Sequence, residues 1–181
     1  LLTSALDGQA LLQIIVQEVT NLLSCEASSV LLLDPSTEEL VFKLATGRGA
    51  PELKEKRLPL GLGIVGWVAQ QAKPALVNDV AQDPRFTPTI DQQTGFVTRS
   101  LLAVPIEDQG RLLGVLAVLN TAKARLFEPV DQELLSAFAS HAAIALRNAE
   151  LYRAATTEKE RLQSVIEERY RTLVAEAGSM K

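Results

Sequence analysis

The stretch that decides the fold is RSLLAVPIEDQGRLLGVLAVLN, residues 99–120, in which two apolar runs are separated by three turn residues. Residues 99–107 and 111–120 are each long enough to cross a sheet, and the Asp-Gln-Gly between them is typical of a tight turn. Long apolar strands joined by a short turn predict an antiparallel hairpin at the centre of a sheet. Pro105 is expected at a position where the strand ladder needs no backbone donor.

The residues before this hairpin predict a helix, another hairpin and several short elements. Asp7 is a favourable N-cap, and apolar residues then recur every three or four positions to about Cys25, which predicts an amphipathic helix. Two short apolar runs flank the turn sequence DPST and predict a hairpin. After a Gly/Pro-rich loop, we expect a strand near 56–58, a helix at 63–71, a strand at 75–77 and a short helix at 90–96.

The chain from Pro129 onward is predicted to be one helix, because no further Gly or Pro occurs until Gly178. Such a helix is roughly 70 Å long, so part of it is expected to leave the domain. An imperfect heptad pattern indicates a two-stranded coiled coil, with a solvated helix that frays beyond about Tyr152 as the alternative. The pattern runs through Leu134, Phe138, His141, Ala145, Asn148, Tyr152, Ala155, Lys159, Leu162, Ile166, Arg169 and Leu173.

Composition narrows the class of protein. With 181 residues, 47% of them hydrophobic, the chain predicts one globular domain with an appendage. The net charge of -4 argues against a nucleic-acid partner, and no apolar run is long enough for direct membrane insertion. One cysteine and one histidine are too few for a disulfide, a zinc site or a thiol cycle, so a cytoplasmic location is expected. Leu1-Leu2 starts inside an apolar pattern, which predicts a piece of a longer protein.

Three local features resemble chemical sites, and each has a plainer explanation. Residues 61–66 satisfy GxGxxG, with Asp79 downstream, but a charged stretch containing Pro59 stands where a dinucleotide fold needs a buried strand. We therefore expect these glycines to let a short helix pack closely. His141 and Cys25 are expected to be a packed or interface residue and a small core residue, respectively.

The polar segment NDVAQDPRF, residues 78–86, would suit a catalytic site, a ligand clasp or a well-built loop. Hydrogen bonds from Asp79 and Asp83 to nearby backbone explain the segment as well as proton transfer does. No confined pair of carboxylates is evident, so nothing in the sequence requires an enzyme.

The order of these motifs resembles the GAF domain. The resemblance covers residues 7–152 and rests on GxGxxGW, NDVxxDPRF, SLLAVPI, GVLAVLN and the Ala-rich LLxxFAxHAAIALxNAxLY helix. It implies an α+β, PAS-related fold, in which a central antiparallel sheet of about six strands has helices on both sides and a long C-terminal helix. Residues 1–152 would form the GAF domain, and residues 153–181 a coiled-coil linker to an output domain.

The resemblance also implies a small-molecule pocket that NDVAQDPRF shapes and partly covers. Arg85 and Arg99 are the best charge partners for an anionic ligand, although either can pair with Asp79 or Asp83 instead. Each pocket candidate is equally explained as a core residue. The candidates are Trp67, Val77, Asp79, Phe86, Ile90, Phe96, Ser100 and Leu102.

The known activities of the family are matched only in part. The cyclic-nucleotide signature keeps Asn120, Phe127 and Asp131, but Thr121 and Gln132 replace its Lys and Glu. Lys123 remains a candidate partner for Asp131. Cys25 is expected on the wrong side of the fold for covalent bilin attachment, and a single cysteine cannot complete the cycle of the free methionine sulfoxide reductases.

We therefore expect a non-enzymatic regulatory domain of a multidomain signalling protein, such as a sensor histidine kinase of a two-component system or a nucleotide cyclase. It would sense an unidentified small molecule, form a homodimer through its N- and C-terminal helices, and act on a C-terminal output domain. A ligand-free dimerisation spacer is the main alternative, and a cyclic-nucleotide-binding GAF domain is the other. The sequence leaves the cofactor unknown.

Overall fold

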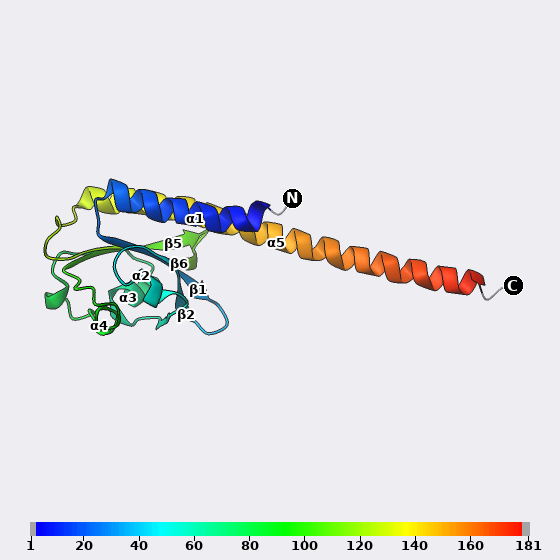
Figure 1. Ribbon diagram of the computed structural model, residues 1–181, viewed down its shortest axis with the longest axis horizontal. Coiled ribbons are helices and arrows are strands. Elements are labelled where there is room, and N and C mark those ends of the chain that lie inside the picture. The colour runs from blue at the N-terminus through cyan, green and yellow to red at the C-terminus, as the bar shows by residue number, and fades with distance from the viewer. Residues whose placement is uncertain (1–2, 179–181) are drawn as a thin grey trace.

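The hairpin expected from residues 99–120 lies within the sheet of the computed structural model, which describes residues 3–178 (Figure 1). β5 (Ser100–Asp108) pairs antiparallel with β6 (Arg111–Asn120), and β6 pairs antiparallel with β1 (Ala27–Asp34). The six-stranded sheet has the order β3-β2-β1-β6-β5-β4. The fold is therefore α+β, with an antiparallel sheet as expected.

The outer strands are short and also antiparallel. β2 (Glu39–Ala45) pairs with β1 and with β3 (Arg57–Pro59), and β4 (Ala75–Val77) pairs with β5. The strand that precedes GxGxxG is thus the antiparallel edge strand β3, which excludes the dinucleotide-binding arrangement. A Cβ on Gly66 would lie 2.9 Å from the Pro59 carbonyl oxygen. As expected, this glycine, which lies within α3 (Gly63–Gln71), lets the helix pack closely against the end of β3.

Alternate residues of the central strands build two separate cores. Leu102 and Val104 of β5 pack towards α1 (Thr3–Leu22) and α5 (Pro129–Gly178). Leu101 and Ala103 pack towards α3 (Gly63–Gln71) on the other face. Both faces of the sheet are therefore covered by helices (Figure 1).

The smaller helices lie on the face opposite α1 and α5 (Figure 1). They are α2 (Ala50–Leu53), α3 and α4 (Thr89–Thr94). The bounds of α3 agree with the prediction, whereas α2 forms within the stretch that we expected to be a loop. The prediction for the first helix was wrong at both ends: α1 begins before Asp7 and ends at Leu22, short of Cys25.

α5 has 50 residues and extends far beyond the sheet (Figure 1). Its last buried residue is Ala149, and all its described residues from 151 onward are exposed. The exposed part is roughly 40 Å long. Ala145, which we expected in the coiled-coil seam, is instead buried, and its carbonyl oxygen lies 3.6 Å from the position that a Cβ on Gly8 would take. Within the domain this stretch of α5 therefore packs on α1 of the same chain.

None of the helices within residues 3–178 is both long enough and apolar enough to cross a bilayer.

A partly buried ion pair fixes the beginning of α5. The Arg125 guanidinium donates to both carboxylate oxygens of Asp131, at 2.7 and 2.8 Å, and to the Leu23 carbonyl oxygen after α1 at 2.9 Å. The Glu128 backbone N–H also donates to Asp131, at 2.7 Å. The partner of Asp131 is therefore Arg125, not Lys123. The loop before α5 places Arg125, two residues after Lys123, against Asp131 in the first turn of the helix.

We predict that Asp131→Asn lowers the free energy of unfolding by about 1–2 kcal/mol at pH 7, because Asp131 is buried while Arg125 is half-exposed and partly screened. Hydrogen bonds from Arg125 hold the pKa of the Asp131 carboxyl below its usual range. A carboxyl whose pKa is lower in the folded state stabilises the fold above its unfolded pKa of about 4. The difference between wild type and variant should therefore shrink as pH falls below about 4. Urea unfolding at several pH values measures it.

Glu158→Gln is the matched control, because it removes the exposed pair that Glu158 forms with Arg161 on the same helix. This variant should unfold like the wild type at every pH. Equal effects of the two substitutions would contradict a structural role for the Arg125–Asp131 pair.

Candidate ligand-binding site

A cavity of about 100 Å³ lies between the sheet and the layer of α2, α3 and α4. On the sheet side, Ser29 of β1 stands directly beside Ala45 of β2 and Ala117 of β6 in the strand register. All three residues line the cavity. Because their side chains are small, they leave a hollow that larger residues would fill.

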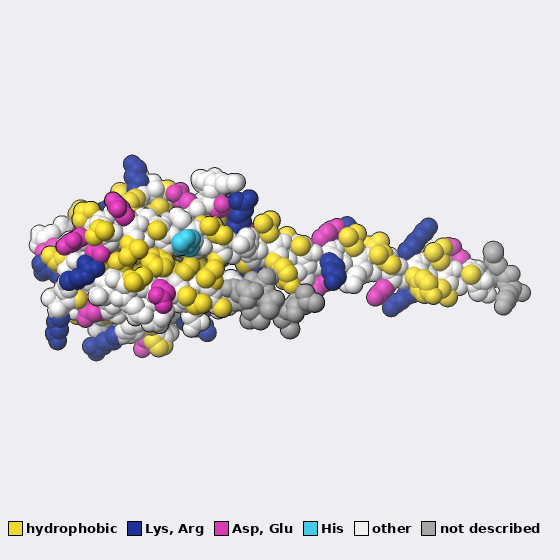
Figure 2. Space-filling view, turned by 90° about the horizontal axis from the view of Figure 1, so that it is seen from above, with side chains coloured by type: hydrophobic (Ala, Val, Ile, Leu, Met, Phe, Trp, Pro, Cys, Tyr) yellow, Lys and Arg dark blue, Asp and Glu magenta, His cyan; other side chains and the backbone are white. Residues whose placement is uncertain are grey.

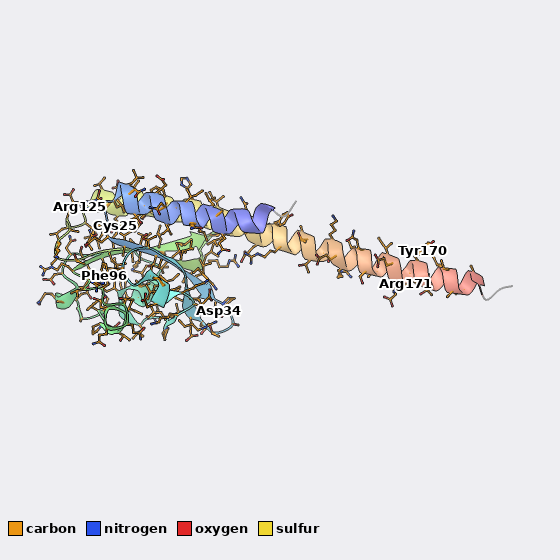
Figure 3. All side chains as sticks on the ribbon, viewed as in Figure 1. Cys25, Asp34, Phe96, Arg125, Tyr170 and Arg171 are labelled. Carbon is orange, nitrogen blue, oxygen red and sulfur yellow. The ribbon has the colours of Figure 1, made fainter. Side chains whose placement is uncertain are left out.

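The walls of the cavity are mainly apolar and come from strands, small helices and loops. Figure 3 labels one of these side chains, Phe96, below the sheet. Apolar walls with a few polar groups are typical of small-ligand sites, but the volume is below the range of roughly 300–1,000 Å³ for drug-sized ligands. The large apolar side chains that line it are Phe42, Leu53, Leu58, Leu62, Ile64, Val65, Phe86, Ile90, Phe96, Leu101 and Leu119.

The lining also includes polar groups, which differ in how they are satisfied. The Asp91 carboxylate accepts hydrogen bonds from the Thr98 N–H and hydroxyl, both at 2.7 Å. Ser29, which is 5% exposed, also lines the cavity, and its hydroxyl forms no hydrogen bond with residues 3–178. Arg48, from the loop between β2 and α2, also lines the cavity.

Of the eight side chains that we expected at a pocket, Phe86, Ile90 and Phe96 come together in the cavity wall. Trp67 and Val77 pack against the apolar core on the same side of the sheet without lining the cavity.

The other three expected residues lie away from the cavity. Leu102 is fully buried in the core under α1 and α5, while its neighbour Leu101 lines the cavity. Our choice of Leu102 was off by one residue, which in a strand places a side chain on the opposite face. Ser100 shares the face of Leu102 by the same alternation. Asp79 pairs with Arg99 at 3.3 Å, outside the lining.

The segment NDVAQDPRF is a well-built loop attached to the start of α5. The Asn78 side chain donates to the Phe127 carbonyl oxygen at 2.8 Å and accepts from the Phe127 N–H at 2.9 Å. A 3₁₀ turn follows at Val80–Gln82, with Val80 buried. The segment therefore joins the edge of the sheet to the connection that leads into α5.

The second half of the same segment is held by charge and delivers an aromatic side chain to the cavity. The Arg85 guanidinium donates to both oxygens of Asp83 at 2.9 and 2.6 Å, and lies 4.3 Å from the centre of the Trp67 ring. These hydrogen bonds lower the pKa of the Asp83 carboxyl. Phe86 then lines the cavity. Arg85 and Arg99 are thus paired with Asp83 and Asp79, the alternative that the sequence left open.

Cys25 belongs to the core between the sheet and α1 and α5, on the face opposite the cavity. Burial raises the pKa of its thiol to about 11, so the thiol is protonated and unreactive near neutral pH. Figure 3 shows Cys25 close to the end of α1.

The small residues of the cavity floor and Arg48 were not among the residues that we expected at the pocket. A usable signal was present: β1 begins with three consecutive small residues, Ala27 to Ser29, and Ala117 has large neighbours on both sides in β6. Small residues on one face of a buried strand indicate a cavity or a close contact. Arg48 carried no such signal, because its position depends on how the loop folds.

The comparisons with known proteins agree with this fold. The GAF domain model matches residues 7–146. The chain is 32% identical, over 176 residues, to dual 3',5'-cyclic-AMP and -GMP phosphodiesterase 11 of Drosophila melanogaster, with 90% of this chain and 12% of that protein covered. It is 36% identical, over 147 residues, to cone cGMP-specific 3',5'-cyclic phosphodiesterase subunit alpha' of Mus musculus, with 77% and 16% covered. The chain thus spans only a small part of these relatives.

The structure also resembles that of residues 122 to 287 of a methyl-accepting chemotaxis protein, with a TM-score of 0.72 and 23% identity. That match covers 81% of this chain and 93% of the other. The similar proteins are thus signalling proteins of more than one kind. Because the family model matches more than half of its length, the chain belongs to the GAF domain family.

Proposed function

We propose that this GAF domain is the small-molecule-sensing and dimerisation module of a cytoplasmic multidomain signalling protein, such as a sensor histidine kinase or a nucleotide cyclase. Residues 1–152 would sense, and residues 153–181 would carry the signal to an output domain; residues 1–2 and 179–181 lie outside the described part. The domain itself would not be an enzyme. The observation that carries the proposal is an apolar cavity lined by Phe86. The loop that carries Phe86 (residues 78–86, the covering loop) is hydrogen-bonded through Asn78 to Phe127, just before α5 begins.

Contacts of the covering loop supply a route from cavity to helix. Phe86 lines the cavity, and Asn78 in the same segment holds both backbone groups of Phe127. Phe127 lies two residues before Pro129, where α5 begins. A ligand that displaces Phe86 would therefore pull on the beginning of α5, and the straight helix would transmit the movement out of the domain.

An apolar groove between α1 and α5 supports the proposed homodimer. Ile14 and Ile144 are 57% and 58% exposed, although both are large and apolar. Figure 2 shows hydrophobic side chains gathered around the histidine on this face. Contiguous exposed apolar patches commonly mark interaction surfaces. The groove is lined by Leu11, Ile14, Ile15, Glu18, Phe138, His141 and Ile144.

The exposed part of α5 supports a continuation of the dimer as a coiled coil. Its apolar side chains would be covered by the same helix of a second chain, in parallel orientation. Because Ala145 is already covered by α1, the proposed coiled coil begins further along α5 than the heptad pattern alone indicated. The exposed apolar residues are Leu151, Tyr152, Leu162, Val165, Ile166, Tyr170, Leu173 and Val174.

The small cavity volume favours a second candidate, a dimerisation spacer with a vestigial pocket. A cyclic nucleotide is a further candidate ligand, because the relatives named above are phosphodiesterases for cyclic AMP and cyclic GMP. A ligand of that size would have to displace α4 and the loop that carries Phe86. The following experiment separates these possibilities.

We predict that native mass spectrometry of the protein purified from its host will detect an added mass that is absent under denaturing conditions. Ala117→Leu should abolish the added mass, because the larger side chain fills the cavity floor. Ser29→Val, a smaller change on the same floor, keeps the test valid if the first variant unfolds. Bare protein, with no thermal shift on addition of cyclic AMP or cyclic GMP, would favour the spacer.

A second prediction concerns the groove. Ile144→Glu should weaken the dimer roughly tenfold or more, because it places a charge in an apolar interface. Sedimentation velocity at micromolar concentration measures the change. Val97→Glu is the control, because Val97 is also an exposed apolar residue, at 74%, but lies outside α1 and α5. A wild-type protein that sediments as a monomer would contradict the proposed dimer.

A further inference from the structure

Arg48 is the one positively charged residue among the described residues that line the cavity. It lies in the loop between β2 and α2, is exposed, and stands at the rim of an otherwise mainly apolar space. An arginine at the rim of an apolar cavity can interact with solvent and with a ligand's charged end at the same time. Its position is therefore suited to the recognition of a charge.

The backbone on both sides of Arg48 is fixed by close contacts. Gly47 and Gly49 have φ angles of +88° and +81°, which favour glycine. A Cβ on Gly47 would lie 2.5 Å from the Glu26 carbonyl oxygen, and one on Gly49 would lie 2.4 Å from the Thr94 Cβ. The loop is thus held against the start of β1 on one side and against α4 on the other. This contact reduces the entropy lost when Arg48 orders around a ligand.

Arg48 has no salt bridge or hydrogen bond with any residue from 3 to 178. Arg85 and Arg99, in contrast, are each paired with a neighbouring aspartate. Asp91, the acidic residue of the lining, is occupied by two hydrogen bonds from Thr98. The guanidinium of Arg48 is therefore the available charged group at the cavity.

We propose that the cavity binds a small carboxylic acid with an apolar body, and that Arg48 holds the carboxylate. The inference rests on the proposed sensory function and adds the ligand class. The apolar body would lie among Phe86, Ile90 and Phe96, and the carboxylate would meet Arg48 at the rim. The Ser29 hydroxyl on the floor would serve a polar substituent at the other end of the ligand.

The size of the cavity and the chemistry of arginine both support this class. An engineered cavity of about 150 Å³ binds benzene, so a cavity of about 100 Å³ suits a short chain, or one ring once the surrounding small helices shift slightly. An arginine fork binds a carboxylate through two parallel hydrogen bonds, which are stronger than neutral ones. A neutral molecule of the same shape would keep the apolar contacts and lose this pair.

The test uses three probes of one shape and different charge: benzoate, benzamide and benzylamine. Their dissociation constants are measured by isothermal titration calorimetry or, for weak binding, by NMR titration of the full chain. We expect wild-type protein to bind benzoate roughly tenfold more tightly than benzamide, with benzylamine the weakest. Ala117→Leu should abolish binding of all three probes.

Arg48→Gln should remove the preference for benzoate over benzamide and leave benzamide binding unchanged. Arg48→Lys should keep part of the preference for benzoate, because lysine keeps the positive charge without the planar guanidinium. Arg171→Gln is the control for net charge: Arg171 lies near the far end of α5 (Figure 3) and should not alter any dissociation constant.

Three outcomes would overturn the inference. Equal binding of benzoate and benzamide that Ala117→Leu abolishes would leave a sensory pocket without a charge anchor. Tighter binding of benzylamine than of benzoate would indicate that Asp91, rather than Arg48, binds the charged end of the ligand. If no probe binds at millimolar concentration, the ligand class is wrong, and native mass spectrometry then decides separately whether the sensory function stands.

Discussion

Burial of the central hairpin on both faces is the constraint on which the rest of the structure depends. The apolar residues of β5 and β6 must each pack into one of two cores, and the alternation of the strand assigns each of them to one. Large residues such as Leu102, Leu116 and Val118 fill the core under α1 and α5 completely. On the other face, small residues lie side by side, so that core is incompletely filled and a cavity results.

In the proposed function, this asymmetry would place dimerisation on one face of the sheet and the response to a ligand on the other. The face towards α1 and α5 has a well-buried core and the Arg125–Asp131 ion pair, which would suit the proposed dimer surface because such a surface must keep its shape. The opposite face is built from short helices and loops, which need less free energy to move. In the proposed function, a ligand would move the small helices and loops first, and the hydrogen bonds between Asn78 and Phe127 would carry that movement to the beginning of α5.

Much of the fold could be predicted from the sequence, whereas the site could be predicted only in part. Apolar periodicity and helix-breaking residues determined α3, β4 and α5, because these signals are local. The face on which Leu102 lies required the register of the sheet, and a shift of one residue reverses it. Asp7 had a good N-cap side chain, yet the helix extends before it. The roles of Arg48 and Arg125 depend on loop geometry, for which single residues carry no periodic signal.

The hydrogen bonds between Asn78 and Phe127 limit how strongly a ligand could control the long helix through this link. Each hydrogen bond between neutral groups contributes about 1 kcal/mol net. If the link breaks in one state and holds in the other, it can supply about 2 kcal/mol of coupling, or roughly a thirtyfold change in an equilibrium constant. A protein that uses this link alone would thus respond in a graded manner, and a sharper response would require both chains of a dimer to switch together.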